Sequence, residues 1–204
     1  MKFFLNRVSA KSESYKSQRG FTLLEVLVAV TILIFAITAT FTSAQSGLQS
    51  SQESKNQIIT FYLAQEAVEY IRNMRDTNSI ARISVPTTNW LKDIAENGNS
   101  STDDPCYPGT YCTVDVVKSE LKQCPGGLNG CPYLKQNKSQ GSSAYLMYGY
   151  DDGIGTWATT DFKRVVQIEK IGATEAKIIV TVYWSRGSFS TSFTVRENIF
   201  DWQS

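Results

Sequence analysis

The sequence predicts an α+β fold in which a long N-terminal helix packs on a C-terminal antiparallel β-meander. Two patterns support this prediction. Residues 59–74 place apolar side chains at steps of three and four, as one face of a helix does, and residues 176–185 and 189–196 alternate apolar and polar side chains, as half-buried strands do. With 204 residues and 42% hydrophobic side chains, the chain can build one ordinary core. We therefore expect one globular domain with a helical extension.

The first 20 residues form a basic leader, in which five Lys and Arg side chains stand against the single carboxylate of Glu13. Because the formal net charge of the whole chain is only +1, the remainder is mildly acidic, which argues against nucleic-acid binding. Residues 21–41 follow with FTLLEVLVAVTILIFAITATF, which is apolar apart from Glu25 and scattered threonines. As a helix this run is about 31 Å long at ~1.5 Å per residue, enough to cross the ~30 Å hydrocarbon core of a bilayer once.

The charge pattern also predicts an orientation. The basic leader should stay cytoplasmic, which places the chain after residue 41 on the outer side of the cytoplasmic membrane. A cleaved secretory signal is the first alternative, but its apolar region covers only ~7–15 residues and ends in a small-residue cleavage site. Here the apolar run is longer and its small residues are dispersed. We expect a retained, single-pass membrane helix with an extracytoplasmic C-terminal domain.

Glu25 is the exception within this run. An ionised carboxylate in a spanning helix costs roughly 2.5–3.5 kcal/mol on insertion scales. The simplest interpretation places Glu25 near the interface, where the dipole of the first helical turn favours an anion by ~0.3–1 kcal/mol. That interpretation does not explain why a basic run ending in Gly20 precedes the carboxylate at this spacing.

The stretch RGFTLLE at residues 19–25 resembles the processing site of type IV prepilins and pseudopilins. The resemblance is specific over residues 19–41 and weaker to about residue 76. It implies a pilin-like fold and cleavage between Gly20 and Phe21 by a membrane prepilin peptidase, which also methylates the new amino terminus. It further implies that Glu25 neutralises the Phe21 amine of a neighbouring subunit as the helices bundle into a filament.

An ammonium and a carboxylate that are buried together cost less than either alone, so such a pair would set the register of assembly more than it would stabilise it. A plain signal anchor with an accidental glutamate is the alternative. Thr42 stands where filament-forming major pilins often carry a helix-kinking proline. The resemblance therefore favours a minor pilin or pseudopilin.

An amphipathic continuation of the helix is expected over residues 42–78. Its first part, residues 42–57, is polar and contains Gly47, which lowers helix propensity by about 1 kcal/mol relative to alanine and could let the helix fray or melt locally. Its second part carries an apolar stripe that we interpret as core. The stripe consists of Ile59, Leu63, Ala67, Tyr70 and Met74.

Residues 79–204 should form the globular domain. We expect a short helix at Trp90–Glu96 with Gly98 just past its end, and a long loop region over residues 97–143 around one strand at 111–117. The meander should then have strands at 162–171, 176–184 and 189–196, joined by turns at 172–175 and 185–188.

Four cysteines lie in the loop region: Cys106, Cys112, Cys124 and Cys131. The spacings C-x5-C and C-x6-C exceed the two to four residues that usually separate structural zinc ligands, and the chain has no histidine. We favour disulfides over a metal site, which requires an oxidising compartment and agrees with the orientation above. Four cysteines allow three connectivities, of which we favour Cys106–Cys112 and Cys124–Cys131.

The sequence offers no catalytic chemistry. The absence of histidine excludes histidine catalysis, and no G-x-S-x-G motif is present. The acidic clusters Asp103-Asp104 and Asp151-Asp152-Gly153 do not match an EF-hand, so we favour surface turns, although the resemblance to pseudopilins leaves a loop calcium site open. We predict no catalytic residue, no cofactor and no metal.

Aromatic side chains cluster at Tyr145, Tyr148, Tyr150 and Trp157. They form either a partner-binding patch or a sheet-edge core with exposed loop tyrosines, and we favour the core.

The leading hypothesis is a structural subunit, a minor pilin or pseudopilin of a type IV pilus or type II secretion-like filament. Its expected partners are a prepilin peptidase and methylase, other pilin or pseudopilin subunits and the membrane, with no nucleic acid. The alternative is a single-pass anchored extracytoplasmic binding module that does not polymerise, and an anchored enzyme is a more distant one.

Overall fold

The chain is described from a computed structural model, which covers residues 20–96, 104–150, 156–186 and 189–203. The leader before Gly20, the acidic residues Asp103 and Asp151–Gly153, the helix stop expected at Gly98 and the centre of the turn expected at 185–188 lie outside the described residues. The chain divides into two compact units, residues 1–50 and residues 51–204, and each is described by itself.

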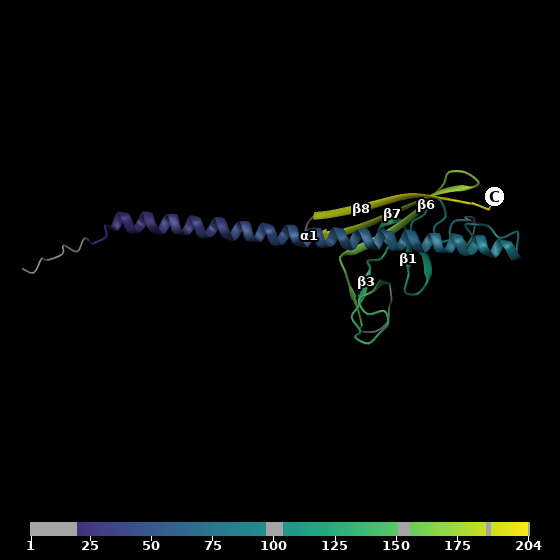
Figure 1. Cartoon of the computed structure of the whole chain (residues 1–204), viewed down its shortest axis with the longest axis horizontal. Coiled ribbons are helices and arrows are strands. Elements are labelled where there is room, and N and C mark those ends of the chain that lie inside the picture. Colours follow the sequence, from purple (N-terminus) through teal and green to yellow (C-terminus); the bar gives the residue numbers. More distant parts are fainter. Residues whose placement is uncertain (1–19, 97–103, 151–155, 187–188, 204) are drawn as a thin grey trace, which may run out of the picture. The chain divides into compact units, whose positions relative to one another are not determined.

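One α-helix, α1, runs from Leu23 to Ser84 over 62 residues (Figure 1). The expectation of a local fray around Gly47 is wrong, because the helix continues through this residue. A glycine costs only about 1 kcal/mol in a helix interior, which the uninterrupted turns on both sides tolerate. The helix also ends beyond the expected residue 78. It stops just before Val85, which precedes Pro86 and is therefore disfavoured in the helical region.

The second unit contains a five-stranded antiparallel sheet of order β2-β1-β6-β7-β8. Its larger part is the predicted meander of β6 (Phe162–Lys170), β7 (Glu175–Arg186) and β8 (Phe189–Phe200). The pairing of β7 with β8 continues without interruption from Glu175 opposite Phe200 to Arg186 opposite Phe189. Figure 1 shows the second half of α1 running along this sheet. The α+β fold expected from the sequence is confirmed.

Shorter strands complete the domain. They are β1 (Cys112–Asp115), β2 (Glu120–Gln123), β3 (Lys135–Asn137), β4 (Tyr148–Gly149) and β5 (Trp157–Thr159), with a short 3-10 helix at Leu128–Gly130. The last three strands form a separate sheet of order β4-β3-β5. The expectation of one strand within residues 97–143 is therefore wrong, since β1, β2 and β3 all lie there.

The helix expected at Trp90–Glu96 is also wrong, because this segment is a series of turns. The side-chain oxygen of Asn89 does accept the amide of Leu91 at 2.9 Å, in an Asx turn. However, Asp93 has a φ of 60°, and a left-handed residue cannot continue a right-handed helix.

The core lies between the second half of α1 and one face of the five-stranded sheet. The predicted stripe is confirmed: Leu63 and Ala67 are buried, and Ile59, Tyr70 and Met74 pack half-buried around them. The buried face of the helix is wider than the stripe and includes three further residues, Ala64, Val68 and Ile71. From the sheet, every second residue of β7 between Ala176 and Trp184 is buried, as the alternation predicts.

Two disulfides close local loops in the domain, Cys106–Cys112 and Cys124–Cys131. This is the connectivity favoured from the sequence. The first disulfide belongs to the main core, where both cysteines are fully buried. The second packs with Val165 in a small cluster of its own. Each disulfide thus fixes a Gly- and Pro-rich loop to a different part of the domain.

Candidate functional site

The residues that the sequence singles out for function surround the start of α1. Thr22 precedes the first helical residue, and its side-chain oxygen accepts the amide of Glu25 at 3.2 Å. This places Thr22 at the N-cap and Glu25 in the first turn, the threonine and glutamate positions of a capping box. The T-x-x-E spacing at residues 22–25 is visible in the sequence. Thr22 could therefore have been predicted as the N-cap beside Glu25.

Both predicted assembly residues are exposed in the first unit. Phe21 is 80% exposed, and Glu25 is also accessible. Within the described residues, no hydrogen bond or ion pair engages the Glu25 carboxylate. The geometry therefore presents an unpaired anion at the positive end of a long helix dipole, five residues after the glycine of the motif.

The hydroxyl groups in the apolar run behave differently from this carboxylate. Thr31 and Thr38 each donate a hydrogen bond of 2.8 Å to a carbonyl of the preceding turn, and Thr40 donates one of 2.9 Å to Ile37. A hydroxyl that is satisfied within its own helix can face an apolar environment at little cost. Over residues 21–41, Glu25 is thus the polar side chain that still requires a partner.

Gly20 is not required by the geometry of this chain. A Cβ atom added there would meet nothing within 4 Å, and its φ lies outside the left-handed region that favours glycine. A glycine that the fold does not need points to recognition by another molecule, since steric access to the backbone is what glycine uniquely offers.

The helix around these residues presents a continuous apolar surface. Large exposed side chains cover it in every turn: Phe21, Leu23, Leu24, Val26, Leu27, Val28, Val30, Ile32, Leu33, Ile34, Phe35, Ile37 and Phe41. Among the described residues, α1 is the one helix long and apolar enough to cross a membrane. A surface of this size far exceeds what soluble monomers expose, so it must be covered by lipid or by protein.

Residues 15–41 match the protein-family model of the prokaryotic N-terminal methylation motif. The chain carries a type IV prepilin signal. No curated protein and no solved structure matches the chain. The prepilin signal and the N-terminal helix describe a type IV pilin-like or pseudopilin-like subunit. A signal of this kind implies membrane anchoring, processing by a prepilin peptidase and assembly with other pilin subunits.

A buried arginine fixes the second half of α1 to the sheet of this pilin-like domain. Arg164 of β6 is fully buried, and its guanidinium donates hydrogen bonds of 2.9 Å to the carbonyl of Leu63 and 2.6 Å to that of Val114. It also forms an ion pair of 2.5 Å with Glu66, whose side chain is 30% exposed. One side chain therefore joins α1, β1 and β6.

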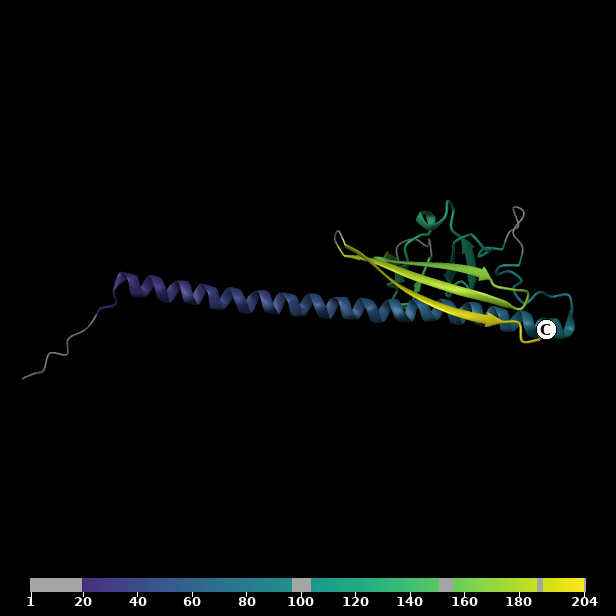
Figure 2. The same cartoon turned by 90° about the horizontal axis from the view of Figure 1, so that it is seen from above.

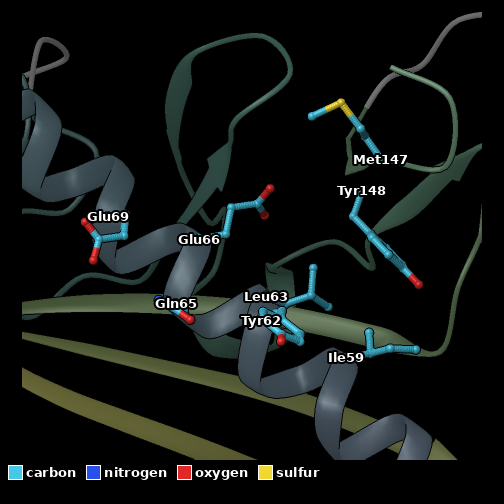
Figure 3. Close-up of a pocket in the computed structure, with 8 residues that line it drawn as sticks. All are labelled: Ile59, Tyr62, Leu63, Gln65, Glu66, Glu69, Met147 and Tyr148. Carbon is cyan, nitrogen blue, oxygen red and sulfur yellow. The ribbon is translucent and has the colours of Figure 1, made fainter. Parts of the chain in front are cut away.

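Beside this ion pair lies an open, mostly apolar pocket of about 610 Å³ between α1 and the loop before β4 (Figure 3). Ile59, Tyr62 and Leu63 line it from the helix, and they are faced by Tyr148, the first residue of β4, and by Met147 just before it. The carboxylates of Glu66 and Glu69 lie at its rim.

The aromatic cluster divides between core and surface. Tyr148 and Tyr150 pack against the main core, whereas Tyr145 is 41% exposed. Burial raises the pKa of Tyr150 to about 12, and its hydroxyl lies 3.4 Å from the Arg164 carbonyl, to which it donates. No group of three or more potential metal ligands occurs among the described residues.

Proposed function

We propose that this chain is a minor pilin or pseudopilin that is cleaved after Gly20 and assembled into a filament through its N-terminal helix. The observation that carries the proposal is the unpaired carboxylate of Glu25 in an apolar helix whose threonine hydroxyls are satisfied internally. Cleavage creates a cation at Phe21, close to the anion at Glu25. The amine of one subunit is the partner that the carboxylate of the next requires.

The proposal assigns the parts of the chain as follows. Residues 1–20 are the leader that the peptidase removes, residues 21–41 are the membrane and assembly helix, residues 42–78 continue the helix, and residues 79–204 form the extracytoplasmic domain. Before assembly the chain is a single-pass protein of the cytoplasmic membrane, and afterwards it is part of a pilus or pseudopilus. It has no enzymatic activity of its own.

The first test is intact-mass analysis and N-terminal sequencing of the protein recovered from its native membrane. We expect a chain that begins at methylated Phe21. The matched variant is Gly20→Val, which should leave the fold unchanged because the space around Gly20 is open, and should accumulate the uncleaved precursor. A wild-type chain that still begins at Met1 would overturn the processing step.

The second test addresses assembly. A photo-crosslinking residue at Ile34 should give ladders of crosslinked subunits in membranes. Glu25→Gln should remove these ladders while leaving processing intact, because it removes the charge and keeps the side-chain shape. Glu53→Gln is the control, since it makes the same change on α1 outside residues 21–41. A processed chain that forms normal ladders with Glu25→Gln would exclude the proposed role of Glu25, and a wild type without ladders would favour the anchored binding module.

A further inference from the structure

The outer edge of β8 is long and has no partner strand in the described part of the chain. β8 has 12 residues and pairs there only with β7, and Figure 2 shows it in front of β7 and β6. Because its ladder with β7 has no interruption, no bulge turns the edge away. The opposite edge, β2, has four residues and carries an ion pair between Glu120 and Lys122. Natural proteins protect edges by shortness, charge, proline and bulges, and β8 has no proline and no bulge.

The register determines which backbone groups are available. The amide of Asp201 donates to Thr174 at 2.8 Å, one step beyond the pair of Glu175 and Phe200. In an antiparallel ladder the residues that bond to the neighbouring strand alternate with residues whose N–H and C=O point outward. The outward set is therefore Ser190, Ser192, Thr194, Arg196, Asn198 and Phe200. The carbonyl of Phe200 agrees with this, since it accepts a hydrogen bond of 3.1 Å from Arg75 of α1.

The other outward groups have no such partner. Within the described residues, no hydrogen bond reaches the backbone of Ser190, Ser192, Thr194, Arg196 or Asn198 from outside the sheet. Their side chains lie on the face away from α1, because the alternate residues Phe193 and Val195 pack toward the core. They form a flat surface of small hydroxyl and amide groups with one charge, Arg196, which is exposed and forms no ion pair among the described residues.

We propose that the outer edge of β8 binds an extended segment of another protein by β-strand addition, and that this segment carries an Asp or Glu beside Arg196. Outward N–H and C=O groups at every second residue are complementary to the backbone of an added strand. Directly opposed charges of opposite sign stabilise cross-strand pairs, and like charges destabilise them.

Charge also distinguishes a foreign strand from a second copy of this chain. If two β8 edges paired antiparallel about Thr194, Arg196 would face Ser192 and its charge would stay without a partner. If they paired in parallel and in register, Arg196 would lie beside Arg196. Neither arrangement provides a counter-charge, whereas an acidic residue of a different segment does. The proposal goes beyond filament membership and does not depend on processing at Gly20.

The test uses the full chain in detergent micelles and a capped nine-residue peptide of alternating threonine and valine with one central glutamate. Amide hydrogen exchange is measured residue by residue by NMR. We expect the peptide to slow exchange at least about tenfold at Ser192, Thr194 and Arg196, and to leave the alternate amides, which already bond to β7, unchanged. A matched peptide with lysine in place of glutamate should bind about three- to tenfold more weakly.

Two variants and one control variant sharpen the result. Arg196→Glu should reverse the preference between the two peptides, while Lys92→Glu, which changes the net charge equally at an exposed residue in the turns at 90–95, should not. Ser192→Pro removes an outward N–H and should abolish binding of the glutamate peptide. The melting temperature of this variant shows whether it folds. If it does not fold, the result with Arg196→Glu decides whether the proposal holds.

Three outcomes overturn the proposal. The first is that exchange along β8 is not slowed at alternate residues when the peptide is added. The second is that the glutamate and lysine peptides bind with equal affinity, both to wild type and to Arg196→Glu. The third is that the outward amides of β8 are already protected without peptide, in a micelle that contains two chains.

Discussion

The buried ion pair of Arg164 and Glu66 makes a quantitative prediction about how α1 is held to the domain. Replacing Glu66 by leucine leaves the guanidinium fully buried with carbonyl acceptors but no counter-charge. Removal of one member of a buried pair typically costs about 3–5 kcal/mol. We therefore expect Glu66→Leu to lower the free energy of unfolding by about this amount.

Removal of the cation should cost less. In Arg164→Met, the carboxylate of Glu66 can turn to solvent because its side chain is already 30% exposed. The carbonyl of Leu63 keeps its bond within the helix, so the main loss is the carbonyl of Val114, which costs about 1–3 kcal/mol when left unsatisfied. The double variant removes both charges together. It should be no less stable than Glu66→Leu alone, giving a coupling energy at least as large as the cost of Arg164→Met, about 1–3 kcal/mol.

The assay is urea unfolding of the full chain in micelles, followed by the fluorescence of tryptophans that include the buried Trp90 and Trp184. Glu69→Leu is the matched control on the same helix, since its ion pair with Arg72 joins side chains that are 55% and 38% exposed. It should cost less than about 1 kcal/mol. Additive costs for the Arg164 and Glu66 variants, or equal effects of Glu66→Leu and Glu69→Leu, would refute the reasoning.

Three further perturbations test other parts of the chain. Because burial raises the pKa of Tyr150 to about 12, the contribution of its neutral form to stability is complete below pH 10 and is lost as the pH rises toward 12. Urea unfolding at pH 8 and at pH 11 measures this loss, and Tyr150→Phe should make the difference in unfolding free energy between the two pH values smaller. Replacing Cys106 and Cys112 together by serine should lower the free energy of unfolding by about 2 kcal/mol, as expected for the short loop they close. Thermal unfolding measures this loss, and the wild type unfolded in the presence of a reductant should be destabilised as well. Thr22→Val should weaken the first turn of α1 by about 1 kcal/mol and speed exchange of the Glu25 amide, whereas Thr31→Val, which removes no cap, should leave that amide unchanged.

The sequence predicts the parts of this fold in which a periodic pattern of apolar residues repeats more often than chance arrangement would produce. The stripe from Ile59 to Met74 and the alternation in β7 and β8 each extend over eight or more residues, and the structure confirms them. Strands β1 to β5 have two to four residues each, which is too short for an alternation to be recognised. Tertiary hydrogen bonds and the disulfides define these short strands.

The candidate site shows the same division. Gly20 and Glu25 are visible in the sequence because their motif is local, and Thr22 was equally visible through its spacing to Glu25. Arg164 was not, because an arginine is generally expected at the surface, and its burial depends on acceptors supplied by Leu63 and Val114 from distant parts of the chain. The end of α1 before Pro86 could have been predicted from the restriction that proline places on Val85.

The local closure of both disulfides affects how the protein matures. The linked cysteines are six and seven residues apart, and segments this short close on the order of 10–100 ns, long before a sheet forms. If the chain reaches an oxidising compartment from its N-terminus onward, Cys106 and Cys112 are in contact before Cys124 arrives. Once an oxidant has joined them, Cys124 has only Cys131 left. Pairing in order of arrival gives the native connectivity, so maturation of this domain should require little help from disulfide isomerases.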